Sequence, residues 1–147
     1  TEIVQMDLTG GLGPITVTFT LRDPAKSPFR RSTGEIEENV NNTPGVLDIP
    51  PFTPAGTASS FFDVFFEIEV VDNTNVTNNP VTAIILHNED PVRVEIPDLQ
   101  HKPPGPGEQY CNPTQVPVTL FDEDGNPTDF KILAKCHIPN PLPELNG

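Results

Sequence analysis

The longest regular alternation of apolar and charged side chains spans residues 61–71, which read FFDVFFEIEVV. All even positions of this run are apolar, whereas its odd positions include one aspartate and two glutamates, Glu67 among them. A period of two places successive side chains on opposite faces of a strand, so we expect one strand with its even face in the core. Phe61 and Phe65 interrupt the polar face, which predicts that another part of this chain, or another copy, covers them.

Shorter runs with the same period predict further strands. Residues 15–21 alternate without a fault between apolar side chains and threonines, which is typical of a half-buried strand. Residues 32–40 fit either a weak strand or a helix start, because Ser32 and Glu35 match a capping box, and Gly34 favours the strand. The other predicted strands are 2–8, which precedes a turn at 10–14, then 81–86, 92–96, 116–120 and 130–138.

The last two of these strands form a predicted hairpin whose register follows from its apolar side chains. Directly opposed residues share a sheet face, so we expect Leu120 to pair with Phe130 and Val118 with Ile132. The connection then holds an odd number of residues, three or five, with Gly125 in the left-handed region.

The pattern as a whole predicts an all-β protein. Nineteen prolines are spread along 147 residues, which excludes any substantial helix. We expect an antiparallel β-sandwich of about seven or eight strands, with Greek-key connections as one option and a small barrel as the alternative. Residues 1–138 should form this single domain, and residues 139–147 an extended C-terminal tail.

Charge narrows the range of partners. The chain has eight Lys and Arg against 21 Asp and Glu, a net charge of −13. Such a surface repels phosphates, which argues against nucleic acid as a partner. No run approaches the roughly 18–20 apolar residues of a membrane span. Half of the basic residues lie within 22–31, either as scattered loop charges or as a positive patch for an acidic surface on another subunit.

Two groups of side chains are candidate metal ligands. The loop at 122–129 clusters carboxylate and amide oxygens, which calcium prefers, although a plain hairpin turn explains the same residues. Its candidate ligands are Asp122, Asp124, Asn126 and Asp129. His87, Glu89 and Asp90 form a second group, for which a surface turn is the alternative. We expect no other cofactor.

Several features favour a secreted or cell-surface protein. The register of the hairpin places Cys136 opposite Thr114, and a bend at Pro113 would bring Cys111 close enough for a disulfide. Asn41 and Asn75 each begin a glycosylation-type sequon. The numbering starts without Met, directly before a strand-like run, which fits removal of an export signal and a trimmed chain equally well.

Several motifs resemble those of uncharacterised exported bacterial proteins that are rich in β structure. They are SFFDVFFEIE at 60–69, LHNEDPV at 86–92, PPGPGEQY at 103–110, VPVTLFDEDGNPTDF at 116–130 and the opening EIVQMDLTGGLGPITV at 2–17. The resemblance implies export, a β fold and a surface or matrix role, and it transfers no catalytic residue. This chain departs from the pattern at Asp129, where such members carry Gly after Asn-Pro-Thr.

These observations predict a non-catalytic extracellular structural subunit, such as a surface-layer, appendage or filament protein. We expect it to assemble with copies of itself through sheet-edge or strand-addition contacts. The residues expected at such contacts are Ile3, Val4, Met6, Leu8, Phe61 and Phe65. The alternative is an exported binding or adhesion module for a glycan, a protein or a calcium-bridged ligand. An enzyme is a third, weaker possibility, because no catalytic set of side chains stands out.

Overall fold

The computed structural model describes residues 1–73 and 82–137, and within them it contains strands and loops but no helix. No membrane-spanning helix is found in this part of the chain. The six-stranded sheet has the order β1 (Asp7–Leu12), β2 (Ile15–Leu21), β5 (Phe66–Asp72), β6 (Thr82–Asn88), β9 (Val118–Phe121) and β10 (Pro127–Ile132). The five-stranded sheet has the order β11 (Cys136–His137), β8 (Tyr110–Cys111), β7 (Val92–Leu99), β4 (Ala58–Val64) and β3 (Thr33–Glu38).

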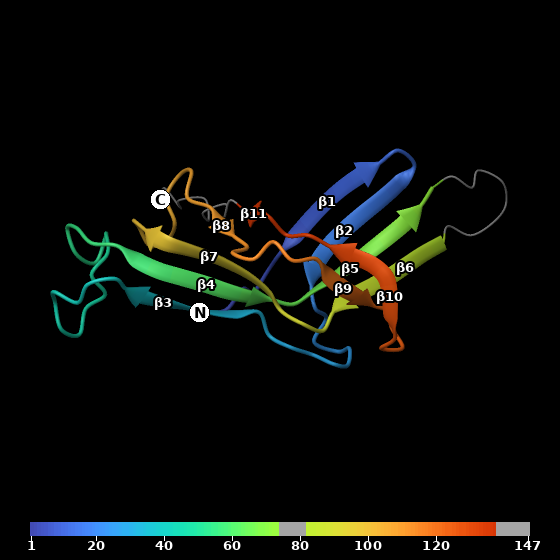
Figure 1. Ribbon diagram of the computed structural model, residues 1–147, viewed down its shortest axis with the longest axis horizontal. Helices are drawn as coiled ribbons and strands as arrows, with labels where there is room; N and C mark the ends of the chain where they lie inside the picture. Colours follow the sequence, from blue (N-terminus) through green and yellow to red (C-terminus); the bar gives the residue numbers. More distant parts are fainter. Residues whose placement is uncertain (74–81, 138–147) are drawn as a thin grey trace, which may run out of the picture.

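The two sheets pack as an antiparallel sandwich, which confirms the predicted fold class. In Figure 1 the five-stranded sheet occupies the left half of the view and the six-stranded sheet the right half. The chain passes between them where β4 leads into β5 and where β6 leads into β7. The predicted number of strands was wrong, since the described residues contain eleven. Two predicted strands, 61–71 and 130–138, each divide between the sheets.

The break in the longest alternating run falls at Phe65. β4 ends at Val64 and β5 begins at Phe66, so the predicted single strand crosses from one sheet to the other. Its even face was nevertheless predicted correctly, because Val64, Phe66 and Ile68 are all buried in one core cluster. A change of sheet leaves period-two alternation intact, so the pattern contained no sign of the break.

The crossover is held by Asn88, the last residue of β6. Its Oδ1 accepts a hydrogen bond from the Phe66 amide at 2.8 Å. Its Nδ2 donates to the carbonyl oxygens of Val64 and Asp90, each at 2.9 Å. One buried amide therefore joins the end of β4, the start of β5 and the turn that follows β6.

We predict that Asn88→Ala destabilises the fold by about 2 kcal/mol, because it leaves buried backbone groups of Val64 and Phe66 without these partners. Urea unfolding followed by circular dichroism measures the change. Asn39→Ala is the matched control, since the Asn39 amide makes its hydrogen bonds at an exposed site. Equal stability of the two variants would contradict the role given to Asn88.

The apolar interior consists of two clusters. The larger joins the two sheets and contains Val64, Phe66, Ile68, Leu86, Val92 and Leu120. The smaller lies under the five-stranded sheet and contains Ile49, Ala58, Ile96, Leu99 and Tyr110. Phe62 and Val94 pack against both clusters and are themselves only partly buried.

The first strand differs from its prediction. β1 covers residues 7–12 rather than 2–8, and a two-residue turn of Gly13 and Pro14 leads directly into β2. Gly13 has φ 60°, which suits the first position of such a turn. Before β1, Ile3 and Met6 pack against the larger cluster, whereas Val4 is 86% exposed. The apolar residues of this segment therefore do not share one strand face.

The strand prediction for 32–40 and part of the hairpin prediction are confirmed. β3 pairs with β4 so closely that a Cβ on Gly34 would lie 2.0 Å from the Phe61 carbonyl oxygen. In the hairpin, Val118 pairs with Ile132, and Gly125 has φ 81°. The predicted pair of Leu120 and Phe130 is absent from the ladder, because the register shifts between Pro127 and Lys131.

Candidate functional site

A disulfide joins Cys111 of β8 to Cys136 of β11, as predicted. The two residues pair directly in the five-stranded sheet, so the expected register with Thr114 was wrong. The cause is the break between β10 and β11, which moves Cys136 into the other sheet. With both cysteines oxidised, the chain has no free thiol for nucleophilic catalysis.

An apolar cleft of about 850 Å³ lies between the inward faces of the two sheets. Both sheets and the segment before β1 contribute side chains to it, and β11 with the disulfide lies at its wall. Its apolar lining includes Met6, Phe19, Phe62, Val94, Tyr110 and Ile132. Clefts of this size and character are typical of small-molecule sites.

A pair of hydroxyl groups is buried in the lining of the cleft. Ser60 Oγ and Tyr110 Oη lie 3.0 Å apart, so each satisfies the other. The Tyr110 ring also packs against Phe62, with 5.4 Å between ring centroids. Burial raises the pKa of the Tyr110 hydroxyl above its usual value near 10, and the charge of Glu108 raises it further, so the hydroxyl is neutral near pH 7.

Two lysines lie among the residues that line the cleft. Lys102 follows the end of β7, and Lys135 directly precedes β11. Within residues 1–73 and 82–137, neither lysine has an ion-pair partner. Asp7 is the only carboxylate of the lining in the described chain, and it accepts a hydrogen bond from the Gln5 amide at 3.0 Å.

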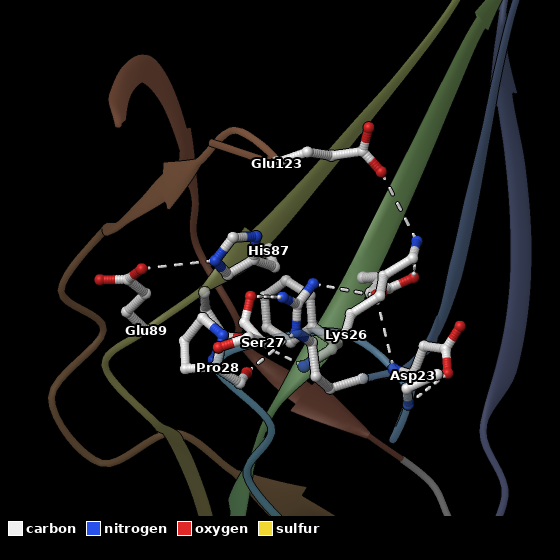
Figure 2. Close-up of polar contacts among 12 residues, drawn as sticks. Asp23, Lys26, Ser27, Pro28, His87, Glu89 and Glu123 are labelled. Carbon is white, nitrogen blue, oxygen red and sulfur yellow. Dashed lines mark hydrogen bonds and ion pairs between the residues drawn. The ribbon is translucent and has the colours of Figure 1, made fainter. Parts of the chain in front are cut away.

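A second polar cluster lies on the six-stranded sheet and involves the loop after β2. Arg22 Nη1 lies 2.9 Å from Glu67 Oε1, and Lys26 Nζ lies 3.2 Å from Glu67 Oε2. The Arg22 guanidinium also donates to the carbonyl oxygens of Ser27 and Pro28, a part of the loop that Figure 2 shows folded over the sheet. These contacts pin the loop to β5.

The sequence pattern misplaced Glu67 by assigning it to a polar strand face. The structure buries Glu67, with 8% of its surface exposed, beneath two of the basic residues from 22–31. The clustering of basic residues in that segment was visible in the sequence, but their partner was not. The positive charges of Arg22 and Lys26 are therefore used within the chain.

His87 lies beside this cluster and is 1% exposed. Its Nε2 lies 3.4 Å from Glu89 Oε1, and the contact can be followed in Figure 2. Among the residues that the structure describes, its Nδ1 has no hydrogen-bond partner, and its ring packs against Phe121. Asp90 of the predicted metal group is exposed, and in the described part of the chain the only side-chain carboxylate that contacts the imidazole is that of Glu89.

The predicted calcium loop is shaped by its own hydrogen bonds. Asp122 Oδ1 accepts hydrogen bonds from the amides of Asp124 at 3.0 Å and Asn126 at 2.9 Å, which is the geometry of a side-chain-supported turn. Across the described residues, no three His, Cys, Asp or Glu side chains lie close enough to hold a metal ion. Calcium binding at Asp122, Asp124, Asn126 and Asp129, or at the His87 group, stays a prediction.

The two phenylalanines on the polar face of the longest run are both half-buried, and each has an arginine beside it. The Arg93 guanidinium lies 4.0 Å from the centroid of Phe61 and forms a two-point ion pair with Asp63. Arg30 lies 6.0 Å from the centroid of Phe65. Groups of this chain therefore cover part of both rings.

Of the two sequons, Asn41 lies in an exposed position of the loop between β3 and β4. That loop is organised by Asp48, whose carboxylate accepts hydrogen bonds from Thr43 and Asn42, and these bonds hold the pKa of Asp48 below its usual value. Asn75 and the predicted tail at 139–147 lie outside the described residues.

Comparisons with protein-family models, with curated proteins and with solved structures find no match to this chain. The arrangement of its own residues is therefore the basis for a functional proposal. Two features of the described chain could contact another molecule. They are the apolar cleft and the edge strands of the two sheets.

Proposed function

We propose that this chain is a non-catalytic extracellular structural subunit, of a surface layer, appendage or filament, that assembles with copies of itself by strand pairing at β1. The observation that carries the proposal is the contrast between β1 and the other three sheet edges. An unpaired edge presents a row of backbone donors and acceptors, and natural proteins usually blunt such edges.

Three of the four edges are blunted. The β3 edge carries three glutamates, and Gly34 near its start already exchanges backbone hydrogen bonds with Thr1. The β10 edge begins with Pro127 and has an irregular register. The β11 edge is only two residues long and is closed by the disulfide.

The β1 edge has none of these features. Its six residues, DLTGGL, contain one carboxylate, no lysine and no proline. The pair of Leu12 and Ile15 flanks the two-residue turn and is hydrogen-bonded, so alternation turns the backbone groups of Asp7, Thr9 and Gly11 away from β2. In the described chain, no other strand pairs with that outer side.

Pairing of β1 with β1 of a second copy would join two six-stranded sheets about a two-fold axis. Val4 and Leu8, which are 86% and 44% exposed, would lie close to such a contact. Ile3 and Met6 are already packed in the core of their own chain, so they leave the set of proposed contact residues. Phe61 and Phe65 lie away from β1 and would serve a second contact in a longer assembly.

We predict that Thr9→Pro abolishes the association while leaving the fold intact. The substitution removes an N–H that points away from β2, and proline is tolerated at such positions of edge strands. Size-exclusion chromatography with light scattering should give a dimer or larger species for the unchanged chain and for Thr9→Val, and a monomer for Thr9→Pro. A monomeric unchanged chain, also dispersed in negative-stain images, would refute the proposal.

A binding module remains the second candidate function, and the observation that favours it is the apolar cleft with Lys102 and Lys135, which have no ion-pair partner within residues 1–73 and 82–137.

A further inference from the structure

We infer that the cleft between the sheets binds an amphipathic anion, an unbranched aliphatic chain that ends in a carboxylate, as in a long-chain fatty acid. Asp7 and Leu8 of β1 also line the cleft, but strand pairing would use the outward backbone groups of β1 and ligand binding the side chains of the lining, so this inference does not depend on the proposed function. It rests on the size of the cleft, on the character of its lining and on the charges at it.

The apolar part of the inference comes from the lining. Side chains that would be core residues in a closed sandwich, such as Phe62, Val94 and Met6, face the cleft and are only partly buried. Covering such surface is worth about 25 cal/mol per Å², so an apolar body gains by entering. The volume of about 850 Å³ lies in the upper part of the range for small-molecule sites, which suits an extended chain.

The frame around the cleft is covalently and sterically held. The disulfide fixes β8 to β11 at its wall, and the hydroxyl pair of Ser60 and Tyr110 satisfies the buried polar atoms inside it. An apolar ligand therefore enters without leaving either hydroxyl unpaired. A preformed site of this kind loses less conformational freedom on binding than a flexible one.

The positive charges at the cleft predict that the ligand ends in an anionic group. Only eight residues of this acidic chain are basic, and two of them, Lys102 and Lys135, line the cleft without an ion-pair partner in the described chain. The carboxylate of Glu108, in the same connection between β7 and β8 as Lys102, accepts hydrogen bonds from the backbone amides of Gln100 and Gly105, each at 2.6 Å. A carboxylate on the ligand would form ion pairs with these ammonium groups, whereas a cationic amphiphile would be repelled by them.

Tyr110 makes the inference directly testable. The chain contains one tyrosine and no tryptophan, so its intrinsic fluorescence above the phenylalanine background comes from a residue in the cleft lining. Sodium oleate is titrated into the full chain below its micelle concentration, with oleyl alcohol and octanoate as parallel titrants, and calorimetry measures the stoichiometry. We expect saturable binding of oleate near one per chain, with a change in Tyr110 fluorescence, and weaker binding of both other compounds.

Two sets of variants separate the site from unspecific adsorption. Lys102→Gln combined with Lys135→Gln should weaken oleate binding about tenfold and leave oleyl alcohol unaffected, since it removes a charge-assisted contact. Lys131→Gln is the matched control, because Lys131 is exposed on β10 and lies outside the lining. It should bind oleate as the unchanged chain does. Val94→Phe, which fills the cleft, should weaken both compounds, and circular dichroism verifies that each variant is folded.

Three outcomes would overturn the inference. The first is no saturable oleate binding, and the second is equal weakening by the cleft variants and by Lys131→Gln. The third is uptake of phosphatidylglycerol vesicles without binding of free oleate, which would point to a membrane surface instead. A second copy of the chain that fills the cleft would also overturn the inference. The associated form would then exclude oleate, and Thr9→Pro, which prevents pairing at β1, would not restore oleate binding.

Discussion

Arg22→Met should destabilise the folded chain by about 3–4 kcal/mol. The substitution leaves the Glu67 carboxylate buried beside the sheet with one cation fewer, and removal of one partner from a buried ion pair is strongly unfavourable. Lys26, at 3.2 Å from the same carboxylate, keeps the loss toward the lower part of the usual range. Equilibrium unfolding in urea, followed by circular dichroism, measures the difference in free energy.

Two further variants identify the cause. Arg31→Met removes an exposed ion pair with Glu2, at 3.8 Å, and should cost less than about 1 kcal/mol. Arg22→Met combined with Glu67→Leu removes both buried charges and should recover much of the lost stability, because no uncompensated carboxylate remains. A double variant as unstable as Arg22→Met would show that packing of the arginine side chain, and not the charge of Glu67, is responsible.

Removal of the disulfide should have a comparable effect. Cys111→Ala combined with Cys136→Ala releases a loop with a sequence separation of 25 residues, and the chain-entropy relation gives a loss of about 3.5 kcal/mol. The double variant avoids a free thiol that could exchange or oxidise. The free energy of unfolding measured in urea tests the value.

Reduction provides the control for that variant. The unchanged chain in excess reductant should lose the same stability, whereas the double variant should not respond to reductant at all. The disulfide also fixes β11 beside β8 at the wall of the cleft, so its loss should weaken oleate binding as well. Unchanged stability after reduction would mean that the two-residue pairing of β8 with β11 holds the wall without the covalent bond.

Local pattern was sufficient for the bounds of β2, for one face of the run at 61–71 and for the turn at Gly125. β2 has the bounds of its alternating run, and the buried face of 61–71 contains the side chains that the period of two places there. Gly125 has the positive φ that its turn requires. Each of these features depends on neighbours within a few residues, so one sequence contains the information.

The disulfide was predicted correctly, but the strand register used to support it was wrong. Two cysteines admit a single intramolecular pairing, so the bond between Cys111 and Cys136 followed once a disulfide was expected. The register used to support it assumed a continuous second strand from 130 to 138. The interruption after β10 places Cys136 opposite Cys111 in the other sheet, which no periodicity near Cys136 indicates.

By itself, the sequence determined that this is an all-β chain and which face of the run at 61–71 is buried, and its two cysteines left one possible intramolecular disulfide. Tertiary structure alone decided that the run at 61–71 changes sheets at Phe65, that Glu67 is buried under Arg22, and that an apolar cleft remains between the sheets. The physical reason is that side-chain alternation depends on the local backbone, whereas sheet membership, ion-pair partners and a cleft depend on segments distant in sequence. Lys102 and Lys135 illustrate this, since 33 positions separate them and only the packed sheets bring both to one cleft.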